Sequence, residues 1–114
     1  YSDIWWGRQS QNGWGLALVQ QGAALAGIWY TYAKQLKPVW YLINGGSWTT
    51  PTKYSAPLYR ATSSPLFGAP YNAVAFDPRQ VGNISIEFTS GTTAVMTYTV
   101  DGVTQSKSIE RLIF

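Results

Sequence analysis

The 114-residue sequence predicts an all-β protein, a small antiparallel up-and-down β-barrel of about eight strands. Three observations predict this class. Apolar residues recur with a period of two in most segments, no convincing helical stretch is present, and short turn-forming pairs separate the segments. Without helices to cover a sheet face, strands in meander order favour a closed barrel, which also removes the sheet edges. A two-sheet β-sandwich is the alternative.

The expected strands follow one another along the chain. They are Asp3–Trp6, Trp14–Gln20, Ala24–Tyr32, Pro38–Asn44, Lys53–Ala61, Ala73–Phe76, Gly82–Thr89, Thr93–Val100 and Val103–Leu112. The pair Asp101-Gly102 is the strongest hairpin signal, because both residues tolerate the positive φ of a tight turn. The pairs Asn12-Gly13, Gln21-Gly22 and Ser90-Gly91 are further turn candidates. Neighbouring strands are therefore expected to be antiparallel and sequential.

One connection is longer than a hairpin requires. The stretch "ATSSPLFGAPYN", residues 61–72, carries two prolines and a glycine and predicts a loop of about ten residues. Loops of this length are often functional, and we expect this one near a mouth of the barrel. The chain length allows one hydrophobic core, so residues 1–114 are expected to form a single domain.

The composition excludes several kinds of chemistry. The chain has no cysteine and no histidine, which removes disulfides, thiolate and imidazole zinc sites, and Ser-His or Cys-His nucleophiles. Nothing in the sequence pairs two of the five carboxylates across a cleft, as a glycosidase would need. We expect no metal, no cofactor and no catalytic residues. A barrel enzyme that uses Tyr, Lys or Arg is the least favoured alternative.

The charge and hydropathy patterns also limit the partners. The net charge is +3, but the basic residues are scattered instead of forming the stripe that nucleic acid binding requires. No window approaches the length of a transmembrane helix, and no basic-then-apolar leader opens the chain. The expected strand from Val103 to Arg111 is too polar for a lipid-facing barrel. We expect neither nucleic acid binding nor membrane insertion.

Aromatic residues are in excess in the N-terminal half. Both faces of the strand "ALAGIWYTY", residues 24–32, are largely apolar, whereas a small barrel buries only one face. The other face needs a loop, a second copy of the domain or a ligand, or it is exposed. Six Trp and eight Tyr are more than a barrel of this size needs to fill its core. The candidate ligand contacts are Trp14, Trp29, Tyr30, Tyr32, Trp40 and Tyr41, with Gln20 and Gln21 as polar anchors. Which face points inward stays open, because a one-residue slip exchanges the two.

A structural role is expected for three other residues. Trp5 and Trp6 lie in the first strand and Arg111 lies near the end of the last strand. Closure of the barrel would make these strands neighbours and would let the guanidinium stack on an indole. A Trp in the first strand paired with an Arg in the last strand of an eight-stranded meander resembles the arrangement in the calycin barrels of lipocalins and avidins.

A second resemblance covers nearly the whole chain. The stretches "IWWGRQSQNGWGLALVQQG", "IWYTYAKQLKPVWYLI", "LYRATSSPLFGAPYN" and "YTVDGVTQSKSIERLIF" look like Trp-rich modules of secreted and cell-surface proteins of proteobacteria. The matching positions are Trp6, Gly13, Trp14, Gly15, Gln21, Gly22, Trp29, Pro38, Trp40, Tyr59, Arg60, Phe67, Gly68, Gly82, Tyr98, Gly102 and Arg111. The resemblance implies export to the periplasm, the cell surface or the medium, and an accessory role without an assigned activity.

These observations favour a non-catalytic binding module whose aromatic cluster holds a small amphipathic or sugar-like molecule. The alternative is a structural module whose aromatic face packs against a homo-oligomeric or tandem copy. A carbohydrate would need exposed, flat indoles, whereas an apolar ligand would need indoles that line an enclosed space.

Overall fold

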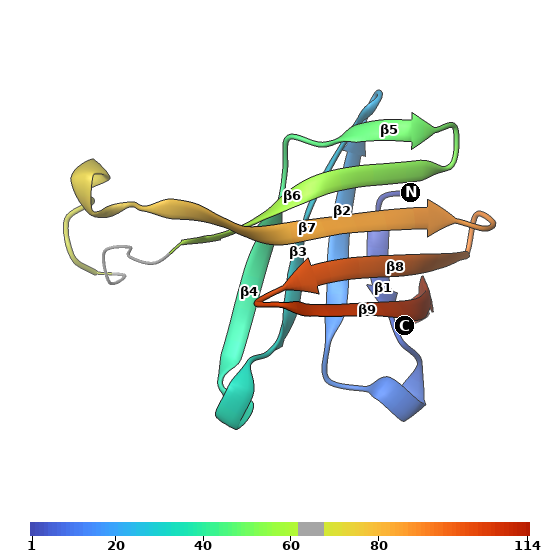
Figure 1. Ribbon diagram of the computed structural model, residues 1–114, viewed down its shortest axis with the longest axis horizontal. Helices are drawn as coiled ribbons and strands as arrows, with labels where there is room; N and C mark the ends of the chain where they lie inside the picture. The colour runs from blue at the N-terminus through green and yellow to red at the C-terminus, as the bar shows by residue number, and fades with distance from the viewer. Residues whose placement is uncertain (62–67) are drawn as a thin grey trace.

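The computed structural model describes residues 1–61 and 68–114, which contain nine strands of one antiparallel sheet (Figure 1). The strands are β1 (Asp3–Trp6), β2 (Gly15–Gln21), β3 (Ala24–Tyr32), β4 (Pro38–Ile43), β5 (Ser47–Thr50), β6 (Lys53–Ala61), β7 (Pro78–Phe88), β8 (Thr93–Val100) and β9 (Val103–Arg111). Their order is β4-β3-β2-β1-β9-β8-β7-β6-β5, and a further pairing of β4 with β6 closes the sheet. The predicted eight-stranded antiparallel barrel is thus confirmed, with β5 as an added strand.

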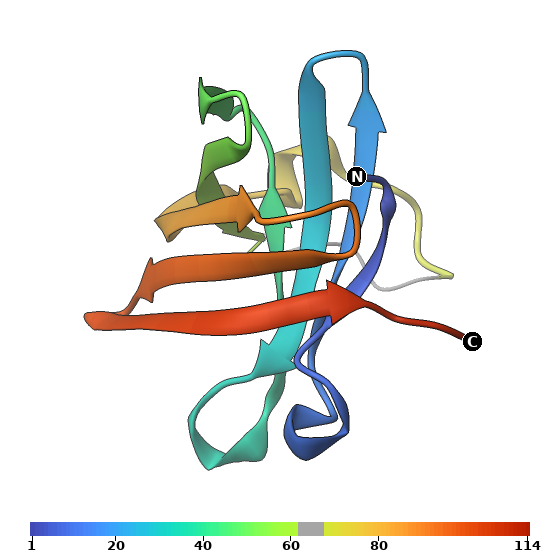
Figure 2. The same cartoon turned by 90° about the vertical axis from the view of Figure 1, so that its right-hand side faces the viewer.

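The barrel consists of two groups of strands that run across each other. Strands β1 to β4 form one group and β6 to β9 the other, as Figures 1 and 2 show from two sides. The groups meet at two short seams. At one seam β1 pairs with β9, Trp5 opposite Arg111 and Trp6 opposite Glu110. At the other seam β4 pairs with β6, Leu42 opposite Tyr59 and Ile43 opposite Leu58.

Two elements differ in kind from the sequence prediction, and β7 begins at Pro78 instead of the predicted Gly82. The expected strand Ala73–Phe76 is wrong, because Ala73–Ala75 is a single 3-10 turn (η3) that begins where the Asn72 side chain accepts a hydrogen bond from the Val74 backbone N–H at 3.2 Å. Strand β5 was not predicted. Of the predicted loop 61–72, Ala61 ends β6, residues 62–67 lie outside the described residues, and residues 68–72 contain no strand.

The described residues contain no α-helix, and the other two 3-10 turns are η1 (Gln9–Gln11) and η2 (Lys34–Leu36). None of the helical segments in this part of the chain has the length and apolarity to cross a membrane.

The direction of each strand face is now defined. In β3 the inward row contains Leu25, Gly27 and Trp29, and the outward row contains Ile28 and Tyr30. The core joins inward residues of both strand groups, and its largest fully buried side chains are Trp5, Leu16, Leu25, Ile43, Leu58, Ile86 and Met96. The apolar inner face drives closure, because each buried aliphatic side chain contributes about 1.5–3 kcal/mol of transfer free energy.

One end of the barrel is sealed by aromatic rings. The Tyr1 and Phe88 rings stack at 3.8 Å between centroids, and Trp48 lies 6.0 Å from each of them. The Trp48 indole N–H donates to the Ala23 carbonyl at 2.7 Å. Strand β5 therefore brings Trp48 over this end of the barrel.

Candidate functional site

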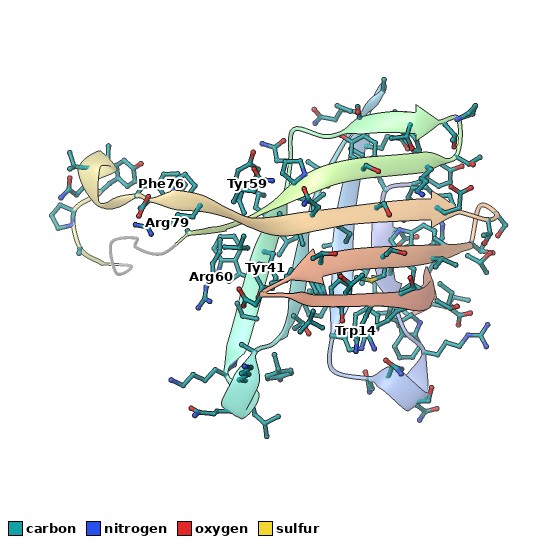
Figure 3. The ribbon with its side chains drawn as sticks, in the orientation of Figure 1. Trp14, Tyr41, Tyr59, Arg60, Phe76 and Arg79 are labelled. Atoms are coloured by element: carbon teal, nitrogen blue, oxygen red, sulfur yellow. The ribbon has the colours of Figure 1, made fainter. Side chains whose placement is uncertain are left out.

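A pocket of about 560 Å³ lies at the end of the barrel opposite the aromatic seal. It forms where β3 ends and β4 begins, where β6 leaves the barrel, and where β8 turns into β9. Figure 3 shows Tyr41 and Arg60 at this end, on the side where the end of β6 and the start of β7 extend away from the barrel. We call this space the mouth pocket. Its volume lies within the range of about 300–1,000 Å³ that is typical of small-molecule sites.

The floor of the mouth pocket consists of three aromatic rings. The Trp29 ring lies 4.5 Å from the Tyr98 ring and 5.2 Å from the Tyr41 ring between centroids. Trp29 and Tyr41 are each only 5% exposed. The Trp29 indole Nε1 is buried and has no hydrogen-bond partner in the described structure. The floor is therefore an apolar surface that contains an unused donor.

The two floor phenols remain protonated well above neutral pH. Burial raises the pKa of Tyr41, the Asp101 carboxylate raises it further, and the Arg60 guanidinium acts in the opposite direction. Burial alone raises the pKa of Tyr98. The Tyr98 hydroxyl donates to the Gln105 Oε1 atom at 2.7 Å.

The charged residues that line the mouth pocket lie at its rim. Lys34, Lys37 and Arg60 supply three positive charges, and Asp101 is the only acidic side chain among the described residues that line it. Lys34 and Lys37 belong to the connection between β3 and β4, which a hydrogen bond from the Ala33 N–H to the Lys37 carbonyl closes at 2.8 Å. The mouth pocket thus combines an apolar floor with a cationic rim.

Three of the predicted ligand contacts, Trp29, Tyr32 and Tyr41, line the mouth pocket. Tyr30 and Trp40 lie instead on the outer face of the barrel, where they border a shallow groove of about 320 Å³ together with Tyr32. The structure therefore divides the predicted aromatic cluster between an inner and an outer site.

The remaining predicted contacts lie apart from the mouth pocket. Trp14 packs beside Gly7, and the Lys107 ammonium lies 5.6 Å from its ring centroid. The Gln20 side chain accepts a hydrogen bond from the N-terminal ammonium of Tyr1 at 2.7 Å, close to the sealed end. Gln21 is exposed at the end of β2.

The three residues expected to be structural lie at the seam of β1 and β9. The Arg111 guanidinium carbon is 5.2 Å from the Trp5 ring centroid, and its Nη1 atom is 2.9 Å from the Asp3 carboxylate. Trp6 is partly buried and stands opposite Glu110. This seam is remote from the mouth pocket.

The lining residues that sequence analysis did not propose as ligand contacts include Lys34, Lys37, Arg60, Tyr98 and Asp101. A signal for two of them was available in the strand alternation. Arg60 continues the inward row Tyr54, Ala56, Leu58 of β6, and Tyr98 continues the row of Met96 in β8. A polar residue in an inward row marks the point where the row leaves the core. No comparable pattern singles out the lysines.

No group of three or more His, Cys, Asp or Glu side chains in the described part of the chain could hold a metal ion. Comparison with protein-family models, with curated proteins and with solved structures gives no match to this chain.

Proposed function

We propose that the protein is a non-catalytic binding module that takes a small amphipathic molecule into the mouth pocket. One observation carries the proposal: the barrel is sealed by aromatic rings at one end and has an aromatic-floored pocket of about 560 Å³ at the other. A small-molecule site combines such an apolar wall with a few polar groups that orient the ligand. The cations of the rim are polar groups of this kind.

The pocket supports an amphipathic ligand better than a sugar. A sugar ring needs the flat face of an exposed aromatic residue, whereas Trp29 is 5% exposed and its neighbours Tyr41 and Tyr98 cover its ring. The resemblance to Trp-rich modules of secreted and cell-surface bacterial proteins supports export as the setting in which the module works.

Titration with N-phenylnaphthylamine, a neutral apolar probe that fluoresces when it leaves water, tests the proposal. Val103 is half-exposed and lines the mouth pocket, so Val103→Trp is expected to fill the pocket and to abolish saturable binding of the probe. Val19 is a similarly exposed valine on the outer face of β2, so Val19→Trp serves as the matched control and retains binding. Equal probe binding by the two folded variants, or no binding by the unmodified protein, contradicts the proposal.

A specific observation favours a second function, assembly with another copy through the outer face of β2, β3 and β4. Ile28, Tyr30 and Trp40 are 43%, 40% and 50% exposed there. Their cross-strand neighbours include Ala17 and Leu42, so the face is continuous. Sedimentation at increasing protein concentration tests this candidate.

A further inference from the structure

We propose that the ligand of the mouth pocket is a small amphipathic anion, with its apolar body on the aromatic floor and a carboxylate-like head against Arg60. This inference rests on the proposed binding function and specifies the chemistry of its ligand. Three observations support it: within the described structure the other three arginines form ion pairs and Arg60 does not, Arg60 lies in β6 beside the aromatic floor, and the rim is positively charged.

The pairing of the arginines distinguishes Arg60 from the other three. Arg8 pairs with Glu110, Arg79 with Asp77 and Arg111 with Asp3, each at 2.9 Å. Arg60 has no ion-pair or hydrogen-bond partner in the described structure, although it lines a pocket. A guanidinium presents a planar fork of donors that matches a carboxylate. The fork of Arg60 is therefore available to a ligand.

The strand geometry places Arg60 beside the aromatic floor. In the β4–β6 seam Ile43 stands opposite Leu58 and Leu42 opposite Tyr59. Tyr41 and Arg60 are the next residues of the two strands, and both continue the inward rows of their strands and line the mouth pocket. The Arg60 charge lies close enough to act on the Tyr41 phenol. Tyr59 and Arg60 accordingly point to opposite sides of β6 (Figure 3). A head group at Arg60 thus lies next to the Tyr41 phenol, a second donor.

The rim charges favour a negative head group at this position. Lys34, Lys37 and Arg60 against Asp101 leave a balance of 3 − 1 = +2 around the opening. Asp101 sits at the tip of the β8–β9 hairpin, where it repels an anion and directs it toward Arg60 of β6 and the two lysines of the β3–β4 connection. The raised pKa of Tyr41 keeps its hydroxyl protonated and able to donate to that anion.

Displacement of bound N-phenylnaphthylamine by decanoate and by decanol tests the inference, because the two competitors share a chain and differ in charge. Decanoate is expected to displace the probe at about tenfold lower concentration than decanol, because one additional charge-assisted hydrogen bond increases affinity by about this factor. Arg60→Gln is expected to remove this preference and to leave displacement by decanol unchanged. Arg79→Gln removes the same charge from the start of β7, outside the mouth pocket, and serves as the matched control.

The outcomes separate the two proposals. If the probe binds in the mouth pocket, but decanoate and decanol displace it equally or Arg60→Gln leaves the decanoate preference intact, the anionic ligand is wrong and the binding function stands. If the probe does not bind at all, the binding function itself is wrong. Added salt gives a further readout, since screening weakens displacement by decanoate and not by decanol.

Discussion

Arg111 stabilises the short pairing of β1 with β9. Its guanidinium lies over the Trp5 ring, pairs with the Asp3 carboxylate and donates to the Gly91 carbonyl. It thereby connects β9 to β1 and to the β7–β8 turn. Only two residue pairs join β1 to β9 in the sheet. Side-chain contacts therefore contribute more to holding these two strands together than they do in the longer strand pairings.

The pairing of Asp3 predicts a pH-dependent effect of Asp3→Asn. A hydrogen bond from the Ile4 backbone N–H and the bond from Arg111 lower the pKa of Asp3 below its ordinary value of 3.8. A lowered pKa in the folded state adds stability that is present above the unfolded value and is lost as the pH falls through the folded value. Asp3→Asn is therefore expected to destabilise the protein at neutral pH, and the difference from the unmodified protein is expected to vanish in acid.

Urea unfolding of both proteins from neutral to strongly acidic pH measures this difference. Arg111→Gln removes the partner of Asp3 and is expected to reduce the pH dependence that Asp3 contributes. A destabilisation by Asp3→Asn that is equal at every pH would show that the Asp3 charge has no role at the seam.

At the scale of the element, β7 depends on a glycine at one position. A Cβ atom at Gly82 would overlap the carbonyl oxygen of Thr99 in the neighbouring strand β8. The register of β6 and β7 also shifts beside Gly82, between its partner Leu58 and Tyr59. The backbones approach so closely there that only glycine fits.

Gly82→Ala is consequently expected to lower the free energy of unfolding by about 1–3 kcal/mol, the usual cost of overpacking. Gly91→Ala is the matched control, since nothing lies within 4 Å of a Cβ atom at that position, and a change within about 0.5 kcal/mol is expected. Thermal and urea unfolding measure both values. Equal stability of the two variants would show that β7 and β8 adjust freely to the added methyl group.

The strands with a clear period of two could be predicted from the sequence, and two short elements could not. A four-residue apolar run such as Ala73–Phe76 has no periodicity that separates a strand from a turn, and Asn72 as a cap was the only local signal. The inward face of β3 could not be predicted either, because both of its faces are apolar. Which face of β3 points inward depends on the whole barrel, in which the inward residues of β7 and β8 pack against those of β3 and β4.

At the scale of the whole molecule, the two ends of the barrel have opposite characters. Tyr1, Trp48 and Phe88 close one end, and the other end carries the mouth pocket with its cations. Sequence analysis predicted an aromatic site but not its division between the inside and the outside, because that division depends on residues far apart in the chain. Trp29 and Trp40, for example, belong to neighbouring strands and serve different surfaces.

The outer face of β2, β3 and β4 supports a prediction about the assembly of the molecule. All outward positions of these fully described strands are uncharged, from Ala17 and Val19 in β2 to Trp40 and Leu42 in β4. A contiguous apolar face of this kind favours burial against a partner, and an uncharged face is compatible with a second copy of itself in a two-fold arrangement. We expect the protein to sediment as a monomer when dilute and as a dimer when concentrated.

A charge at the centre of this face tests the prediction directly. Ile28→Lys is expected to keep the protein monomeric at every concentration, because the two-fold contact would bury two ammonium groups close together. Thr99→Lys places the same charge on an exposed outward position of β8 and is expected to dimerise like the unmodified protein. Because the contact is apolar, added salt should not dissociate the dimer. If Ile28→Lys and Thr99→Lys sediment alike, the outer face of β2, β3 and β4 is not the site of assembly, and its aromatic residues face solvent in the isolated molecule.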